Sequence, residues 1–137
     1  MKVIDLGIKP HEEVDELMKS LQSQRIDDEI PDTLLICEHH EIVTIGPRAR
    51  NDGIKPPEGY SSISVDRGGG LTWHGPGQLV LYPIFKWDLE GEANVKSVIT
   101  KLEEWVIQSL TYLKIPCERN ERMQGVWCGR NKFCSIG

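Results

Sequence analysis

The chain has 137 residues, of which 39% are hydrophobic and 27% charged, a composition typical of one globular domain rather than of a disordered or fibrous protein. Acidic residues outnumber lysines and arginines by 21 to 16, which argues against general binding to nucleic acid or to anionic membranes. The longest apolar run, residues 79–85, is far shorter than the roughly 20 residues of a membrane span, and the N-terminal region is too acidic for a secretory signal. We therefore expect a cytoplasmic protein.

The first half of the sequence predicts short strands around one amphipathic helix. In residues 11–26 the apolar side chains Val14, Leu17, Met18 and Leu21 recur at the spacing of one helix face, and acidic residues crowd the expected first turn. The predicted strands are Lys2–Gly7, Thr33–Cys37, Ile42–Ile45, Ile63–Val65 and Leu79–Trp87, with a loop rich in Gly, Pro, Asn and Asp at residues 48–61.

The second half predicts a longer helix followed by short strands. Asn94 can cap this helix, and the apolar residues from Val95 to Leu113 form one broad face. Short strands are expected at Gly125–Cys128 and Lys132–Ile136. Two helices among many short strands indicate a single α+β domain over residues 1–137, with a mixed or antiparallel sheet packed against helices.

The segment Asp66–Tyr82 (DRGGGLTWHGPGQLVLY) is the most informative part of the sequence. Its many glycines allow the backbone to approach a ligand closely and to present N–H groups. It contains neither GxGxxG nor a GK[ST] ending, so neither nucleotide-binding fingerprint applies. Glycines also mark tight strand connections, and that interpretation stays open. The polar side chains of Arg67, His74 and Gln78 beside this open backbone favour a binding site.

Cysteine and histidine spacing gives no metal motif. The four cysteines have neither CxxC nor zinc-ribbon spacing, and we expect them to be buried or half-buried free thiols in a reducing compartment. A metal site would also need histidines from separate segments, so none is expected. The histidines at the end of the second predicted strand are expected to be structural. The residues concerned are Cys37, Cys117, Cys128 and Cys134, and His11, His39, His40 and His74.

The motif RGGGLTWHGPGQLVLYPI, from Arg67 to Ile84, closely resembles the signature of the lipoyl(octanoyl) transferases. Two further stretches, IPDTLLICEHHEIVTIGPRA and GVWCGRNKFCSIG, resemble that family's strand pair before the site and its later lysine-containing strand, in the same order and spacing. The resemblance runs from about residue 10 to the last residue. It implies the α+β catalytic domain that this family shares with biotin and lipoate protein ligases, and it implies no cofactor and no metal.

The resemblance also implies an activity, the transfer of an octanoyl group to a specific lysine of a lipoyl domain without ATP. The implied donor is octanoyl-acyl carrier protein, and the implied acceptors are lipoyl domains of 2-oxoacid dehydrogenases and the glycine cleavage H protein. An acyl chain needs an apolar slot and its thioester carbonyl needs backbone donors. The family's acyl-binding segments match Arg67, Gly68, Gly69, Gly70, Leu71, Thr72, Trp73, His74, Ser135, Ile136 and Gly137, with His74 expected to line the pocket rather than to transfer protons.

Lys132 matches the lysine that the family pairs with a catalytic cysteine. Only the thiolate attacks a thioester, and a nearby ammonium lowers the pKa of the cysteine. The deprotonated amine can then accept the proton of the incoming lysine. The family's cysteine lies downstream of the Ser135–Gly137 triplet, so we expect that nucleophile to be absent and the domain to be incomplete at its C-terminus. Cys134, two residues from Lys132, is the first candidate for a substitute.

Other interpretations stay open at this point. The chain is an octanoyltransferase, a non-catalytic fragment or pseudoenzyme of that family, or an ATP-dependent lipoate or biotin protein ligase. The segment Gly75–Gln78 argues against a ligase, whereas stabilisation by ATP would favour one. Arg48, Arg50 and Arg67 form a basic group on an acidic protein, and we expect them to help dock the acidic carrier protein.

Overall fold

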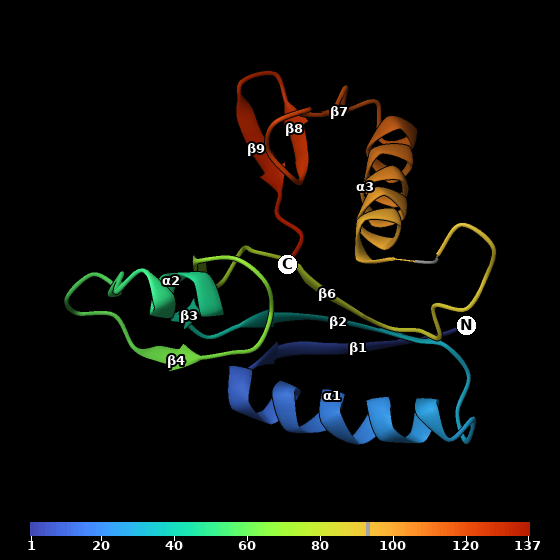
Figure 1. The fold of residues 1–137 in the computed structure, drawn as a ribbon, viewed down its shortest axis with the longest axis horizontal. Coiled ribbons are helices and arrows are strands. Elements are labelled where there is room, and N and C mark those ends of the chain that lie inside the picture. The colour runs from blue at the N-terminus through green and yellow to red at the C-terminus, as the bar shows by residue number, and fades with distance from the viewer. Residues whose placement is uncertain (93) are drawn as a thin grey trace. The chain divides into compact units, whose positions relative to one another are not determined.

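The computed structural model describes residues 1–92 and 94–137. It contains two compact units, Met1–Lys86 and Trp87–Gly137 (Figure 1), which are described separately below. The single domain expected over residues 1–137 stays a prediction. None of the helices in the described residues has the length and apolar character needed to cross a bilayer.

The first unit is built on a three-stranded mixed sheet of β1 (Lys2–Lys9), β2 (Thr33–His39) and β6 (Val80–Ile84), in the order β1-β2-β6. β1 runs parallel to β2, and β6 runs antiparallel to it. Helix α1 (His11–Ile26), with the bounds expected from the sequence, lies along this sheet (Figure 1).

The hydrophobic core of the first unit lies between α1 and the sheet. Val14 of α1 and Leu35 and Cys37 of β2 are almost fully buried, and Ile84 of β6 joins them. The buried residues of β2 alternate along the strand, as expected when one face of a strand meets a helix and the other does not. Burying these side chains is the main contribution to the stability of this unit.

A second, smaller sheet in the same unit carries the glycine segment. It has the order β4-β3-β5, with β3 (Ile42–Ile45) at its centre, parallel to β4 (Ser62–Ser64) and antiparallel to β5 (Leu71–His74). β5 was not predicted from the sequence. The predicted loop at residues 48–61 was also wrong at its start, because a short helix, α2 (Pro47–Asn51), begins directly after β3 with a proline in its first turn.

The second unit contains α3 (Val95–Tyr112) and an antiparallel sheet of β7 (Glu118–Arg119), β8 (Val126–Cys128) and β9 (Asn131–Cys134). The predicted cap is confirmed, because the side chain of Asn94 accepts a hydrogen bond from the N–H of Ser97 at 3.0 Å. The two-residue strand β7 was not predicted, and β9 ends two residues before the predicted bound at Ile136.

The cysteine prediction was wrong for one pair. Cys117 and Cys128 form a disulfide, whereas Cys37 and Cys134 are free. Glu118 of β7 pairs with Trp127 of β8, so this register places the preceding and following cysteines opposite each other, with Cα atoms 4.4 Å apart. Sequence spacing could not indicate this pairing because β7 is too short to be recognised.

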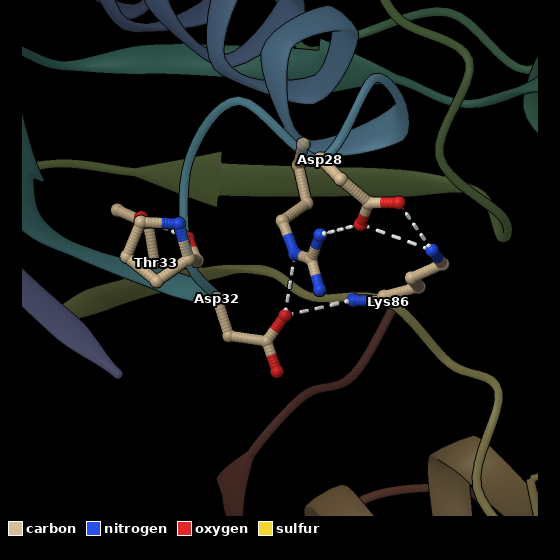
Figure 2. Close-up of polar contacts among 6 residues, drawn as sticks. Asp28, Asp32, Thr33 and Lys86 are labelled. Atoms are coloured by element: carbon tan, nitrogen blue, oxygen red, sulfur yellow. Dashed lines mark hydrogen bonds and ion pairs between the residues drawn. The ribbon is translucent and has the colours of Figure 1, made fainter.

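A group of charged side chains joins the C-terminal end of α1 to the end of the first unit (Figure 2). The guanidinium of Arg25 donates to the carboxylates of Asp28 and Asp32, at 2.6 and 2.7 Å. Lys86 adds an ion pair to Asp28 and donates its backbone N–H to Asp32. The hydrogen bond from Arg25 is the main reason that the pKa of Asp32 lies below its usual value.

We predict that Asp32→Asn lowers the free energy of unfolding at pH 7 by about 1 kcal/mol, because it removes a charged acceptor that is only partly exposed. Since the folded-state pKa is lowered, the stabilisation is present above the unfolded-state pKa and is lost as the pH falls through the folded value. Denaturant unfolding from pH 7 to pH 3 should therefore show the two proteins converging in acid. Asp52→Asn, at an exposed position after α2, should change little; equal effects of both variants would contradict this role.

Candidate functional site

The guanidinium of Arg67 holds the glycine loop, defined here as Gly68–Gly70, against β3. Its Nη1 donates to the carbonyl of Gly68 at 2.9 Å, and its Nη2 lies 3.2 Å from the carbonyl oxygen of Gly70. Nη2 also donates to the backbone carbonyl and the hydroxyl of Thr44, at 3.0 and 2.7 Å. Burial is the largest reason that the pKa of Arg67 is lowered. The guanidinium of Arg67 therefore holds the loop by hydrogen bonds to its carbonyl groups.

The start of α2 holds the same loop from another side. The N–H of Gly46 donates to the carbonyl of Gly70 at 2.9 Å, and the N–H of Arg48 donates to that of Gly69 at 3.2 Å. The contact is so close that a Cβ at Gly46 would lie 2.4 Å from the carbonyl oxygen of Gly69. Gly69 itself has a φ of 96°, which favours glycine. The loop thus requires glycine both within itself and at Gly46.

The carbonyl groups of the glycine loop are hydrogen-bonded, whereas its N–H groups are not bonded within the described residues. Each carbonyl of Gly68, Gly69 and Gly70 accepts a hydrogen bond, from Arg67 or from the start of α2. Across the described residues, no hydrogen bond is donated by the N–H groups of these three glycines. A short run of free backbone donors can bind an oxyanion or a polarised carbonyl oxygen.

Thr72 and His74 of β5 point to the same side of the small sheet as Thr44 of β3. Thr44 and Thr72 are register partners, and the hydroxyl of Thr44 lies 3.3 Å from Nε2 of His74. The other ring nitrogen of His74, Nδ1, lies 2.7 Å from Oε1 of Gln78. Burial is the main cause that lowers the pKa of His74 to about 4, so the ring is neutral at pH 7. The expected role of His74 as a pocket-lining residue stays a prediction.

Further histidines lie beside His74 in the first unit. The ring centroids of His11, His39 and His74 are 5.1 to 6.3 Å apart. His39 is fully buried, its Nδ1 lies 3.0 Å from the carbonyl oxygen of Lys9, and its Nε2 lies 2.8 Å from the hydroxyl of Tyr82. Because a carbonyl only accepts, Nδ1 of His39 is the donor and Nε2 accepts from the tyrosine. His39 is therefore structural, as predicted, whereas His40 is exposed.

In the described residues, His11 is the histidine of this group that has a ring nitrogen without a hydrogen-bond partner. It is buried, and its Nδ1 has no hydrogen-bond partner within the described residues. Burial, followed by the neighbouring His39, lowers its pKa. In the ranges 1–92 and 94–137, no group of histidine, cysteine and acidic side chains could hold a metal ion. The cluster therefore places three imidazole rings side by side, of which His11 and His74 have lowered pKa values.

Leu71 and Trp73 point to the opposite side of the small sheet from Thr72 and His74. They line an apolar pocket whose remaining walls are Val43, Pro57 and Tyr60. The residues matched to the acyl-binding segment are thus divided by strand alternation between a polar side and an apolar side.

Lys132 lies in the second unit, on β9, beside Gly125. A Cβ at Gly125 would lie 2.5 Å from Cε of Lys132, and the φ of 115° at this glycine is one that side chains rarely adopt. Nζ of Lys132 lies 5.9 Å from the ring centroid of Trp127. Gly125 also donates its N–H to the buried carboxylate of Glu103 at 2.8 Å. Glycine at this position therefore provides the space that Lys132 occupies.

The remaining matched residues follow β9 in the second unit. Ser135 and Gly137 are exposed, whereas Ile136 is half-buried, and its carbonyl accepts a hydrogen bond from the side chain of Gln124 at 2.9 Å. The matched residues therefore form two groups, one around the glycine loop in the first unit and one around Lys132 in the second.

Two residues of the site were missed by sequence reasoning. Thr44 connects Arg67 to His74, and the hydroxyl of Tyr82 contacts His39. Both lie in segments that were recognised as strands, and their polar side chains in otherwise apolar strands were the available signal. Buried polar groups need partners, so such residues indicate a hydrogen-bond network.

The thiols of the described residues are not activated. Burial raises the pKa of Cys37 to about 11, and it also raises the pKa of Cys134 more than the nearby Lys132 lowers it. The other two cysteines are joined in the disulfide. Cys134 is therefore a poor substitute nucleophile in this environment.

Comparison with protein families identifies the chain. Residues 11–137 match the model of the lipoyl protein ligase A/B catalytic domain. The chain belongs to this family. Because the match includes β5, the glycine loop and β9, both groups of candidate site residues lie in the lipoyl protein ligase A/B domain.

Curated relatives of the chain are octanoyltransferases. One from Corynebacterium jeikeium is 40% identical over 126 residues, which cover 91% of this chain and 51% of the relative. Another, from Syntrophobacter fumaroxidans, is 36% identical over 141 residues, covering 98% of this chain and 61% of the relative. The chain thus spans about half to three fifths of the length of these relatives.

Solved structures confirm the predicted fold class. A lipoate-protein ligase A bound with ATP matches with a TM-score of 0.62 and 17% identity, over 96% of this chain and 57% of that one. A bipartite lipoate protein ligase from Thermoplasma acidophilum matches with a TM-score of 0.59 and 17% identity, over 96% of this chain and 52% of that one. At this identity the likeness concerns the fold, the α+β lipoate ligase catalytic domain.

We predict that Gly46→Ala destabilises the protein by about 1–3 kcal/mol, because its Cβ would overlap backbone atoms of Gly69 that cannot move as a side chain can. Gly68→Ala is the matched control, since nothing lies within 4 Å of its Cβ position and its φ is not left-handed. Thermal and denaturant unfolding of both variants gives the comparison. Equal stability of Gly46→Ala and the unmodified protein would show that α2 does not hold the loop this closely.

Proposed function

We propose that this chain forms the acyl-binding part of an octanoyltransferase, which moves an octanoyl group from acyl carrier protein to a lysine of a lipoyl domain. The observation that carries the proposal is the hydrogen bonding of the glycine loop, whose three carbonyls all accept hydrogen bonds and whose N–H groups donate none within the described residues. The curated octanoyltransferases among the relatives support the same activity.

In this proposal the free N–H groups of Gly68–Gly70 receive the thioester carbonyl of the donor. Attack at that carbon places negative charge on the oxygen, and fixed backbone donors stabilise this charge without reorganising. The apolar residues Leu71 and Trp73 follow the loop in the sequence, line one pocket and suit the acyl chain. Thr72 and His74 line the polar side.

The proposed role of Lys132 is to favour the thiolate of a catalytic cysteine. The thiolate forms a bond to the octanoyl carbon, and the pantetheine sulfur of the donor leaves as a thiolate that takes a proton from the Lys132 ammonium, which becomes a neutral amine. The acceptor lysine then attacks the acyl-cysteine, an amide forms, the cysteine leaves as the thiolate, and the proton of the amine passes to the neutral Lys132, which becomes an ammonium again. The exchange of one thioester for another is nearly balanced in energy, so the route needs neither ATP nor a metal.

The cysteine of this route is not among the four that the chain contains, in our proposal. The disulfide and the raised pKa values of Cys37 and Cys134 support this, because a nucleophilic thiol requires a lowered pKa. The catalytic cysteine then belongs to a further part of the protein.

The proposed donor surface includes Arg48. Of the three arginines expected to dock the carrier protein, Arg50 and Arg67 donate their guanidinium hydrogen bonds to backbone carbonyls of this chain. We therefore assign the docking role to Arg48 alone. Arg48 is exposed beside Gly70, and its side chain makes no hydrogen bond within the described ranges. A cation at this position suits an acidic carrier protein. The proposed acceptors remain the lipoyl domains of 2-oxoacid dehydrogenases and the glycine cleavage H protein.

The test is a titration of the ¹⁵N-labelled chain with S-octanoyl pantetheine, followed by amide chemical shifts. We expect the amides of Gly68, Gly69 and Gly70 to shift because they become donors, whereas Gly53 and Gly59, in an exposed loop, stay unchanged. S-acetyl pantetheine should bind more weakly because it buries less apolar surface.

Two outcomes would contradict the proposal. Shifts of the glycine loop with ATP and lipoate but not with the thioester would favour an ATP-dependent ligase. The absence of any shift with either ligand would favour a member of the family that binds no acyl donor.

A further inference from the structure

The segment Gly75–Gln78 forms a turn that brings Gln78 back beside the end of β5. The N–H of Gln78 donates to the carbonyl of Gly75 at 3.1 Å, and Gly77 has a φ of 89°. Proline at the second position and a left-handed glycine at the third are the features of a type II turn. The N–H of Gly77 also donates to the carboxylate of Glu38 on β2 at 2.7 Å. The turn is therefore held by one hydrogen bond across it and by another from its third residue to β2.

The amide of Gln78 has one possible orientation in this place. Its Nε2 donates to the backbone carbonyl of Trp73 at 3.0 Å, and its Oε1 lies 2.7 Å from Nδ1 of His74. Exchanging the oxygen and nitrogen would place two oxygens together at Trp73. Since Oε1 only accepts, Nδ1 of His74 must carry the proton. The neutral ring then has Nε2 as an acceptor.

The acceptor nitrogen of His74 faces the hydroxyl of Thr44, which connects the ring to the glycine loop. That hydroxyl oxygen lies 3.3 Å from Nε2 of His74 and accepts from Nε and Nη2 of Arg67 at 3.3 and 2.7 Å. The same guanidinium donates to the carbonyls of Gly68 and Gly70. The one proton of the Thr44 hydroxyl is shared between two acceptors, Nε2 of His74 and the carbonyl oxygen of Thr72, each 3.3 Å away. Through the Thr44 hydroxyl, Gln78 and His74 are linked to Arg67 and to the glycine loop.

We propose that Gln78 is a positioning residue of this site, which fixes His74 in its Nδ1–H tautomer and, through Thr44 and Arg67, holds the carbonyls of the glycine loop so that its N–H groups stay free. Its significance for acyl binding rests on the function proposed above. The tautomer of His74 does not depend on that function and is tested separately.

Charged and titratable groups around His74 support this arrangement. Burial disfavours a charged His74 ring most, and His39 of β2, His11 of α1 and Arg67 of the loop segment act in the same direction, whereas the hydrogen bond to Gln78 raises the pKa. A protonated His74 would direct an N–H at the Thr44 oxygen, which already accepts from the guanidinium. The neutral tautomer set by Gln78 is therefore the one that leaves Thr44 free to accept from Arg67.

The test is ¹⁵N NMR of the imidazole nitrogens in the ¹⁵N-labelled chain, compared between the unmodified protein, Gln78→Met and Gln22→Met. Methionine has the length of glutamine but lacks the amide, and Gln22 is exposed on α1. We expect the Nδ1–H tautomer at His74 in the unmodified protein and in Gln22→Met. In Gln78→Met the Nε2–H tautomer should become populated, and the amide shifts of Gly68–Gly70 should change with it.

Gln78→Glu provides a second variant that keeps a hydrogen-bond acceptor. A carboxylate at Nδ1 should retain the Nδ1–H tautomer and move the midpoint of the His74 titration upward by at least about one pH unit. The proposal is overturned by an Nε2–H tautomer in the unmodified protein, by an unchanged tautomer in Gln78→Met, or by an unchanged midpoint in Gln78→Glu. Because the unmodified chain is itself informative, loss of folding in a variant does not remove the test, and failure of S-octanoyl pantetheine to bind would not affect it.

Discussion

The close contact between the backbone at Gly46 and the backbone at Gly69 is the constraint on which the rest of the site depends. A Cβ at Gly46 would lie 2.4 Å from the carbonyl oxygen of Gly69, so no other residue fits there without moving the loop. This contact directs the carbonyls of the glycine loop toward the start of α2 and toward Arg67. The N–H groups of the loop consequently have no partner in the described residues, which is the property that binding a carbonyl or an oxyanion requires.

The second constraint is the partial burial of a cation, Arg67, beside histidine rings. Arg67 is partly buried, and its charge is balanced by backbone carbonyls and the Thr44 hydroxyl rather than by a carboxylate. Hydrogen bonds to several carbonyl dipoles can compensate for part of the lost hydration of such a group. Burial lowers the pKa values of His11 and His74, and the charge of Arg67 acts in the same direction. The polar network and the loop are thus held by one set of interactions.

Much of the fold could be predicted because regular periodicity is a strong local signal. The bounds of α1 followed from the spacing of Val14 to Leu21, and the start of α3 followed from the capping side chain of Asn94. The short elements α2, β5 and β7 could not be predicted in the same way. They contain too few residues for a period to emerge, and tertiary contacts decide their structure.

The candidate site, too, could be predicted only in part from local sequence patterns. A motif of glycines beside Arg67 and His74 could be recognised as a site from the sequence, and the free N–H groups are consistent with it. The sequence suggested that Arg67 helps to dock a carrier protein, but its guanidinium binds the glycine loop and Thr44 instead. This contact depends on the antiparallel pairing of Thr44 with Thr72. The disulfide between Cys117 and Cys128 also depends on strand register. Because the sequence does not reveal this register, the two cysteines were expected to be free thiols. Contacts between distant segments carry information that spacing alone lacks.

The most direct measurement is amide hydrogen exchange at single-residue resolution in the free chain. The account predicts that the N–H groups of Gly46 and Arg48 exchange slowly, because they donate to the glycine loop, whereas those of Gly68, Gly69 and Gly70 exchange rapidly. Slow exchange at the three loop glycines, or rapid exchange at Gly46 and Arg48 in a protein whose β2 amides are protected, would contradict it.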